Sequence, residues 1–319
     1  MKSIKVAVVG CGYWGKNLAR NFAELDALKS IVDPNPKIAM VHAKEYNVCA
    51  MEMSEVLADE EVSGIVIAAP AELHKKLALE GISAGKHIYV EKPLALSVAD
   101  GEAMRDAAKS ANVTLMVGHL LQYHPVFVEL LKMVKAGDFG KLRYAYSNRL
   151  SMGKFRIEED AFWSLAPHDL SMILSLFGES PSTIHGKGLD FITKGIVDEA
   201  RLDLIFPRGG RAHIFTSWLH PFKEQRLVLV GEKAMAVFDD TANWEQKLAL
   251  YRHDIDNSNS IPEPIKRDVE YINVPMGEPL KLECQHFLNC IKNGTTPITD
   301  AEEGLRVLRV LEAPNLPSA

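Results

Sequence analysis

A glycine-rich turn between an apolar run and a helical pattern constrains the fold of this chain more than any other feature. The apolar run covers residues 4–9, and residues 10–15 follow it with glycine at positions 10, 12 and 15. A helical pattern then begins at Lys16. This order of strand, turn and helix presents free backbone N–H groups and a helix N-terminus to a phosphate group. The pattern therefore predicts a strand–helix–strand unit with an anion-binding turn.

Each glycine of this turn has its own expected role. Gly10 would allow the tight turn, Gly12 would let the backbone approach a pyrophosphate, and Gly15 would let the helix pack closely on the strand. Glycines also mark ordinary turns, so the pattern gains its weight from the strand before it and the helix after it. Tyr13 and Trp14 lie within the turn, and we place them with the glycines in the predicted cofactor site.

Asp33 indicates which dinucleotide is bound. It ends the next predicted strand, residues 28–32, and lies 18 residues after Gly15, close to the spacing of about 20 expected for a ribose-binding carboxylate. Such a carboxylate accepts hydrogen bonds from the ribose hydroxyls and repels a 2′-phosphate. Asp33 therefore favours NAD over NADP. The alternative is that Asp33 and Pro34 only open a turn.

Composition excludes several classes of protein. The chain has 319 residues, enough for two domains, and its net charge of −6 provides no basic surface for nucleic acid. The four cysteines form no Cys-x-x-Cys pair, which favours reduced thiols and no zinc site. We find no run long enough to insert into a membrane and no signal peptide, so we expect a cytoplasmic protein.

The order of predicted elements indicates an α/β protein with two domains. Strands and helices alternate over residues 1–119, which predicts an NAD-binding Rossmann domain with a parallel sheet. Residues 120–319 are expected to form an α+β domain with a mostly antiparallel open sheet, which would bind substrate and form oligomers. In that part we predict helices at residues 126–136, 167–177, 280–293 and 300–311, strands at 142–149, 200–206, 211–217 and 226–230, and a surface loop at 254–264.

Lys92 is the first candidate for chemistry. In an open parallel sheet, ligands bind beyond the carboxyl ends of the strands, and Glu91, Lys92 and Pro93 follow one such end. A lysine there could donate to a substrate hydroxyl or, with a lowered pKa, take its proton. Pro93 would hold the turn and could do so through a cis bond. On spacing alone, however, an isolated Lys-Pro pair is more typical of a surface turn.

His168 is the second candidate. Pro167 suits the first turn of a helix, which would place His168 near the helix N-terminus, where the helix dipole lowers the pKa of the imidazole and keeps it ready to accept a proton. The alternative is that His168 and Asp169 only cap the helix. Tyr123 and His124 lie at the predicted domain junction, where a substrate could be reached from both halves.

Together these motifs resemble the Gfo/Idh/MocA oxidoreductases over essentially the whole chain. The motifs are the glycine turn, Asp33, the stretch Ala-Ala-Pro-Ala-Glu-Leu-His at residues 68–74, Glu-Lys-Pro at 91–93 and His168. The resemblance implies a Rossmann domain followed by an α/β domain whose open sheet often forms the oligomer interface, hence a homodimer or homotetramer. It also implies that Lys92 and His168 are catalytic. The family often has an aspartate four residues before the histidine, where this chain has Ser164, and Asp169 does not occupy that position.

The resemblance implies two sets of binding residues. The NAD-binding set is Gly10, Gly12, Tyr13, Trp14, Gly15, Asp33, Ala69, Pro70, His74, Glu91 and Lys92. The substrate-binding set is Lys92, Gln122, Tyr123, His124, Arg149, Ser164 and His168.

Residues 10–17, 118–125 and 165–170 resemble a narrower branch, the sugar-nucleotide 3-dehydrogenases. These oxidise C3 of UDP-N-acetylglucosamine or of its uronic acid, so that an aminotransferase can install a 3-amino group for lipopolysaccharide synthesis. The resemblance therefore implies a UDP-sugar substrate. Arg149, Lys154 and Arg156 could meet a sugar carboxylate, the diphosphate or solvent. A dehydrogenase of free polyols or sugars and a non-catalytic NAD-sensing regulator remain as alternatives.

Overall fold

The computed structural model describes residues 3–157 and 159–314, and these divide into two compact units. The first unit runs to Tyr123 and then takes in Gly277–Arg309, while the second covers His124–Met276 and begins again at Val310. The first break lies close to the expected division at residue 119, but residues 277–309, which were expected in the second domain, belong to the first unit.

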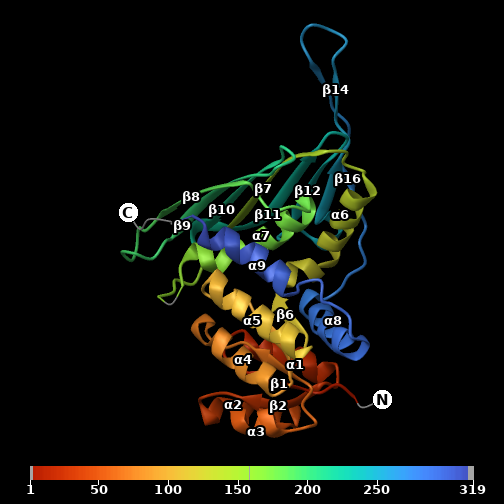
Figure 1. The fold of residues 1–319 in the computed structure, drawn as a ribbon. Helices are drawn as coiled ribbons and strands as arrows, with labels where there is room; N and C mark the ends of the chain where they lie inside the picture. Colours follow the sequence, from red (N-terminus) through yellow and green to blue (C-terminus); the bar gives the residue numbers. More distant parts are fainter. Residues whose placement is uncertain (1–2, 158, 315–319) are drawn as a thin grey trace. The chain divides into compact units, whose positions relative to one another are not determined.

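The first unit contains the predicted parallel sheet (Figure 1). Its six strands lie in the order β3-β2-β1-β4-β5-β6 and all pair in parallel. Their bounds are β1 Val6–Val9, β2 Leu28–Val32, β3 Cys49–Ala50, β4 Gly64–Ile67, β5 His87–Glu91 and β6 Leu115–Gly118. The chain order reverses beside β1, and the carboxyl ends of β1 and β4 flank this switch point, where such sheets bind their ligands.

Local sequence signals account for the helices of this unit. The side chain of Asn35 caps α2 by accepting from the Lys37 N–H, and that of Ser97 caps α5 by accepting from the Asp100 N–H. The predicted helix at residues 71–84 begins with a 3₁₀ turn. The bounds are α1 Gly15–Glu24, α2 Pro36–Tyr46, α3 Met53–Ala58, η1 Ala71–Leu73, α4 His74–Ser83, α5 Val98–Ala111 and η2 Leu120–Tyr123.

Helices α8 (Pro279–Asn293) and α9 (Ala301–Glu312) form where the sequence predicts them, but α8 and α9 as far as Arg309 belong to the first unit. The buried ring of Phe287 on α8 packs edge-on against Phe22 and Tyr89, with centroid separations of 6.5 and 5.8 Å. The periodicity of a helix marks its apolar face but does not indicate which sheet that face will cover. The domain prediction was wrong here for that reason.

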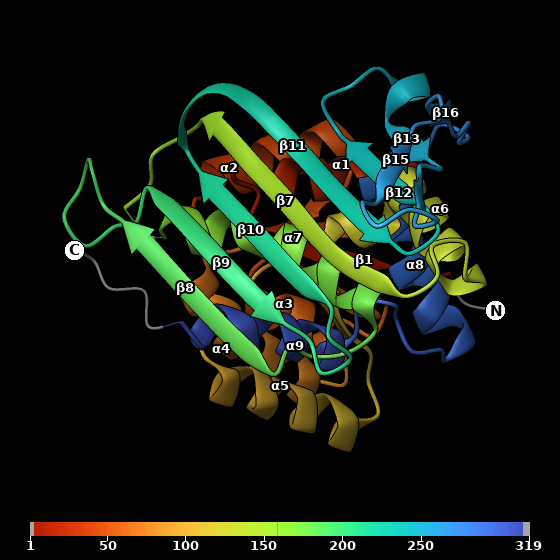
Figure 2. The same ribbon diagram turned by 90° about the horizontal axis from the view of Figure 1, so that it is seen from above.

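The second unit is built on an eight-stranded sheet in the order β16-β13-β12-β11-β7-β10-β9-β8. The β7–β10 pair is parallel and the other pairs are antiparallel. Figure 2 shows this sheet face-on, with α7 behind it. The bounds are α6 Pro125–Ala136, β7 Leu142–Met152, α7 Ala161–Phe177, β8 Thr183–Leu189, β9 Glu199–Ile205, β10 Arg211–Ser217, β11 Leu219–Gly231, β12 Met235–Asp239, η3 Trp244–Gln246, β13 Leu248–Tyr251 and β16 Glu270–Tyr271.

Several strands of this unit were missed by the sequence analysis. β8 carries Gly186 and Gly188, which weaken a strand pattern. The predicted surface loop at residues 254–264 was also wrong, because it contains most of a hairpin formed by β14 (Asp254–Asp256) and β15 (Glu263–Ile265), which projects at the top of Figure 1. Short, exposed strands of this kind have little apolar alternation by which a sequence can reveal them.

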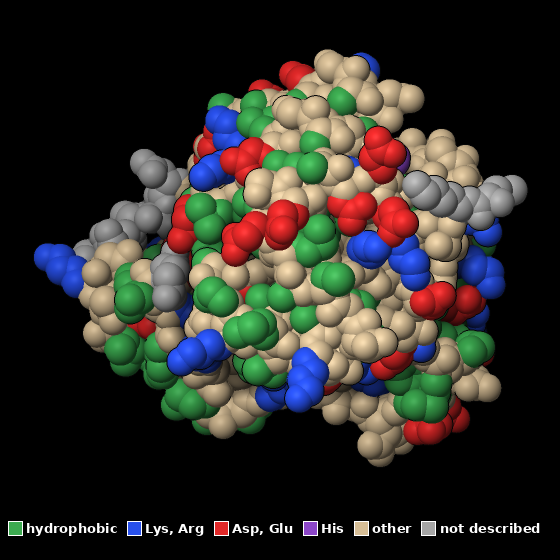
Figure 3. Space-filling model, turned by 90° about the horizontal axis from the view of Figure 1, so that it is seen from below, with side chains coloured by type: hydrophobic (Ala, Val, Ile, Leu, Met, Phe, Trp, Pro, Cys, Tyr) green, Lys and Arg blue, Asp and Glu red, His purple; other side chains and the backbone are tan. Residues whose placement is uncertain are grey.

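One face of the molecule carries side chains of several types. Among the described residues on the face shown in Figure 3, acidic and basic groups are interspersed with apolar ones. No helix within the described ranges is long and apolar enough to cross a membrane.

The packing of α8 yields a test of the two-unit division. We expect Phe287→Ala to destabilise the first unit by about 3–5 kcal/mol, because it removes a fully buried ring from between Phe22 and Tyr89. Urea unfolding followed by tryptophan fluorescence and circular dichroism measures the change. Phe222→Ala, at a ring that is 59% exposed in the second unit, is the matched control and should change stability little. Equal effects of the two variants would contradict the assignment of α8.

Candidate active site

The glycine turn of the first unit can be built only with glycine at its two ends. Gly10 has φ +89°, and a Cβ there would lie 2.8 Å from the carbonyl oxygen of Ala68. A Cβ on Gly15 would lie 1.8 Å from the carbonyl oxygen of Gly10, which no side chain tolerates. At Gly12 a Cβ would meet no atom within 4 Å, so the backbone there is open. The backbone is tightly packed at Gly10 and Gly15 and has free space beside Gly12, and a pyrophosphate can bind in that space.

Asp33 is held at the end of β2, beside this turn. Its carboxylate accepts hydrogen bonds from the backbone N–H of Cys11 at 2.8 Å and of Asn35 at 2.9 Å. Burial, together with the charge of Asp33, raises the pKa of the Cys11 thiol to about 12, so the thiol stays neutral. Asp33 is therefore part of the turn as well as the predicted ribose ligand, and this set of residues fits the adenosine and pyrophosphate part of NAD.

Glu91 connects the glycine turn to the strand end that carries Lys92. The indole N–H of Trp14 donates to its carboxylate at 2.7 Å, and the hydroxyl of Tyr89 donates at 3.2 Å. Burial raises the pKa of Glu91, and the hydrogen bond from Trp14 opposes that rise. Lys92 follows directly, half-buried, and its bond to Pro93 is cis. The structure thus links two parts of the predicted cofactor site through one buried carboxylate.

His74 lies beneath the cofactor-facing loops. It is 1% exposed, and its two ring nitrogens contact the carbonyl oxygens of Pro93 at 2.8 Å and Ala69 at 3.0 Å. Burial lowers the pKa of the imidazole. Ala69 and the exposed Pro70 follow β4 at the carboxyl edge of the sheet. His74 belongs to the set expected to bind NAD, and its contacts join the loop after β4 to the loop after β5.

In the second unit, His168 is not at a helix N-terminus. Helix α7 begins at Ala161, where the side chain of Asp160 accepts from the Trp163 N–H at 2.8 Å, and Pro167 lies inside the helix. The sequence argument took Pro167 for the first turn because a proline usually interrupts a helix interior. The prediction that the helix dipole lowers the pKa of His168 was therefore wrong, since that effect falls off within the first turn.

Arg149 is the next predicted residue whose place differs from expectation. It donates to Asp169 through Nε at 2.7 Å and through Nη2 at 3.2 Å, and Ser147 donates to the same carboxylate at 2.6 Å. All three side chains are buried. Because Arg149 and Ser147 belong to β7, this network anchors α7 to the sheet and orients the turn that carries His168. Arg149 belongs to the set expected to bind substrate, and helix capping was the alternative for Asp169; in the structure the two side chains pair with each other.

Three further predicted substrate contacts are buried. Tyr123 shares a hydrogen bond of 2.9 Å with Thr299 in the first unit, and Gln122 beside it is 3% exposed. In the second unit, the imidazole of His124 contacts the carboxylate of Asp240 at 3.3 Å. Burial raises the pKa of Asp240, but the hydrogen bonds from His124 and Lys247 have the larger combined effect and lower this pKa to about 2. A sequence cannot distinguish polar side chains that bond within the interior from those that line a site.

Ser164 lies one turn before His168 on α7, so the two side chains share a helix face. The Ser164 hydroxyl donates to the carboxylate of Glu159 at 3.2 Å, and Arg156 donates to the same carboxylate at 2.5 Å. Glu159 lies outside the sequence motifs and is not among the predicted site residues. The one feature of the sequence that could have indicated it is its position, five residues before Ser164 and just outside the helix.

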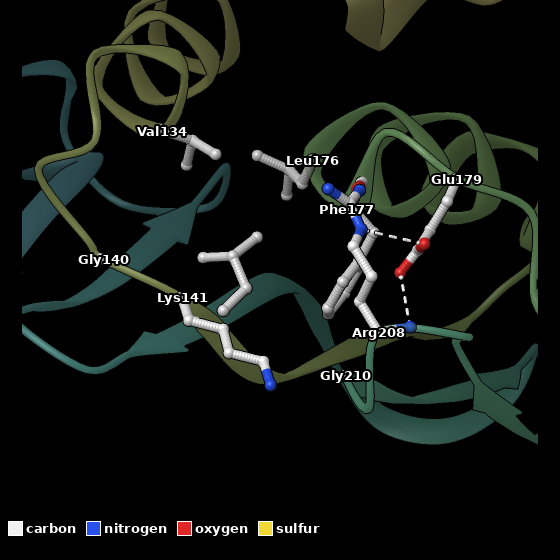
Figure 4. Close-up of a pocket in the computed structure, with 9 residues that line it drawn as sticks. Val134, Gly140, Lys141, Leu176, Phe177, Glu179, Arg208 and Gly210 are labelled. Carbon is white, nitrogen blue, oxygen red and sulfur yellow. Dashed lines mark hydrogen bonds and ion pairs between the residues drawn. The ribbon is translucent and has the colours of Figure 1, made fainter.

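A cavity of about 550 Å³ lies elsewhere in the second unit (Figure 4). Its apolar lining comes from α6, β7 and the last residues of α7, and Arg208 lies at its side. Arg208 donates to the carbonyl of Phe177 at 2.7 Å and to Glu179 at 2.9 Å, so it closes the C-terminal end of α7. Because this is the opposite end of α7 from Ser164, we do not assign the cavity to the candidate site.

Comparison with known families decides the classification. Residues 4–119 match the model of the oxidoreductase family with an NAD-binding Rossmann fold, and residues 127–237 match the Gfo/Idh/MocA C-terminal domain. The chain belongs to the Gfo/Idh/MocA oxidoreductase family. It is an NAD-dependent oxidoreductase, as the predicted turn and Asp33 indicated.

The relatives of this chain are named for different substrates. UDP-N-acetylglucosamine 3-dehydrogenase of Acidithiobacillus ferrooxidans is 26% identical over 97% of this chain and 95% of its own length. A solved structure of that enzyme covers 98% of this chain and 97% of its own, with a TM-score of 0.87 at 25% identity. The scyllo-inositol 2-dehydrogenase (NAD⁺) of Bacillus subtilis is 25% identical over 92% of this chain and 88% of its own length. The 2,7-anhydro-N-acetylneuraminate hydratase of Escherichia coli K12 is 28% identical over 74% of this chain and 68% of its own length.

Asp33 yields a test that separates its charge from its structural role. Asp33→Asn should relax the preference for NAD over NADP by about ten-fold or more, because it removes the repulsion of the 2′-phosphate. The amide oxygen can still accept from the Cys11 N–H, so the turn should persist. Dissociation constants measured from tryptophan fluorescence, with Trp14 as a local reporter, give the ratio. Asp26→Asn, at a fully exposed carboxylate, is the control, and an unchanged ratio in Asp33→Asn would overturn the assignment.

Proposed function

We propose that this protein oxidises the C3 hydroxyl of a UDP-sugar, with UDP-N-acetylglucosamine favoured, to a 3-keto sugar. The observation that carries the proposal is the nearly full-length similarity to a UDP-N-acetylglucosamine 3-dehydrogenase, in both sequence and fold. A 3-keto sugar is the natural substrate of an aminotransferase, so the product would feed synthesis of a 3-amino sugar.

Two side chains are the proposed handlers of the hydroxyl proton. Lys92 follows the carboxyl end of β5, beside the buried Glu91, and its ammonium group could donate a hydrogen bond to the substrate oxygen. His168 is half-buried on α7 and is the proposed base that takes the proton as the carbonyl forms. NAD, when bound, supplies the acceptor for the hydride that leaves the sugar carbon.

The anchoring of both side chains supports these roles. Glu91 ties the backbone before Lys92 to Trp14, and the Arg149–Asp169 pair ties the turn of His168 to β7. Catalytic groups need such fixed geometry, because small errors in position cost large factors in rate.

A free polyol is the second candidate substrate. Similarity to the scyllo-inositol 2-dehydrogenase extends over 92% of the chain at nearly the same identity. UDP-N-acetylglucosaminuronate is the third, since it differs from the favoured sugar only in its 6-carboxylate. Direct comparison of the three substrates distinguishes these candidates.

The purified protein should remove two hydrogens from UDP-N-acetylglucosamine in the presence of NAD. Mass spectrometry of the sugar and absorbance of the reduced nicotinamide are followed together, so that turnover is detected even if the reduced cofactor stays bound. UDP-N-acetylglucosaminuronate and scyllo-inositol are assayed in parallel. Oxidation of either one alone would replace the favoured substrate, and bound NAD without any sugar oxidation would favour the regulator.

Lys92→Met should reduce turnover by about 10²–10⁴-fold, the usual contribution of a proton-handling group. Binding of NAD should change by no more than about three-fold, because the turn around Gly12 and Asp33 is untouched. Steady-state kinetics and a cofactor titration provide the two numbers. Lys76→Met, at an exposed lysine of the same unit, is the control. Parallel losses of turnover and NAD affinity in Lys92→Met would show that Lys92 serves the cofactor instead.

A further inference from the structure

We propose that Glu159 supplies the carboxylate that supports His168 and that Ser164 is the side chain that holds it in place. This inference rests on the proposed function, in which His168 handles the hydroxyl proton. It assigns a positioning role to a residue that lies outside the helix and outside every motif of the sequence.

Ser164 and His168 share one face of α7. Ser164 and His168 are four residues apart within this helix, and side chains at that spacing lie one above the other. Helical side chains also tilt toward the N-terminus, so the imidazole of His168 leans back over the turn that carries Ser164. A carboxylate bonded to Ser164 therefore lies on the His168 side of the helix.

Glu159 is held in place by two side chains. It accepts from the Ser164 hydroxyl at 3.2 Å and from the guanidinium of Arg156 at 2.5 Å. Its side chain is 20% exposed, which limits screening of its charge by solvent. A fixed, partly buried carboxylate of this kind stabilises an imidazolium as it forms.

Two other described acidic residues beside this part of α7 are engaged elsewhere. Asp160 accepts from the backbone of Trp163 and begins the helix, and Asp169 is taken up by Arg149 and Ser147. Of these three described carboxylates, Glu159 is the one bonded to a side chain on the face of His168. Ser164 and Glu159 together therefore place a negative charge beside the turn that precedes His168.

Glu159→Gln tests this role. The variant should lower kcat by about ten-fold or more, with little change in the affinity for NAD. The acidic limb of the kcat/KM profile should move to lower pH by up to about one unit, because loss of the negative charge makes the imidazolium of His168 less stable. The cationic Arg156 is left without its partner and acts in the same direction. Glu129→Gln, which removes a carboxylate from α6, is the matched control and should leave the profile unchanged.

A second variant distinguishes this role from a structural one. Ser164→Asp combined with Glu159→Gln returns a carboxylate to the turn before His168, so it should recover most of the lost kcat and return the acidic limb toward its original pH. Rescue of this kind does not follow from repair of a folding defect. No rescue and no shift of the limb in Glu159→Gln would overturn the proposal.

A third readout is independent of the sugar. Histidine resonances in the NMR spectrum report the protonation of each imidazole, and the His168 signal is identified by its absence in His168→Gln. The pKa of His168 should be lower in Glu159→Gln than in the unmodified protein. Identical titrations would overturn the inference. A lower pKa together with no oxidation of any tested sugar would instead refute the proposed function and leave the Glu159–His168 coupling standing.

Discussion

The approach of Gly15 to the carbonyl oxygen of Gly10 is the contact on which the rest of the first unit depends. A side chain at Gly15 would place its first carbon 1.8 Å from that oxygen, so α1 could not begin where it does. With the helix start fixed, the backbone at Gly12 is open and Trp14 reaches Glu91. One steric constraint thus links the turn, the cofactor site and the strand end that carries Lys92.

Each unit contains a buried charged group that is satisfied by hydrogen bonds close to a candidate residue. In the first, Glu91 receives hydrogen bonds from Trp14 and Tyr89. In the second, Arg149 and Asp169 form a two-pronged ion pair whose partners are both buried. Removal of one partner from such a pair leaves an uncompensated buried charge and is strongly destabilising. These side chains are buried, and their hydrogen bonds fix the backbone beside Lys92 in the first unit and beside His168 in the second.

In the mechanism that we propose, proton handling on α7 involves more than the motif residues. The face that carries His168 also carries Ser164, which reaches Glu159 outside the helix. A relay assembled from separate segments can vary in its residues while keeping a carboxylate near the imidazole. The substrate candidates, which range from a nucleotide sugar to a polyol, all require removal of a hydroxyl proton, so this arrangement serves any of them.

The sequence by itself determined the local features, which are the Rossmann turn, NAD as the cofactor and the position of most helices, and it supplied Lys92 and His168 as candidates. These depend on residues close together along the chain, where turn sterics and helix periodicity act directly. Only the tertiary structure decided that α8 covers the first sheet, that α7 continues through Pro167, and that Arg149, Tyr123 and His124 are buried in supporting contacts. A polar side chain carries no local sign of its partner, because its partner is chosen by the packing of distant segments.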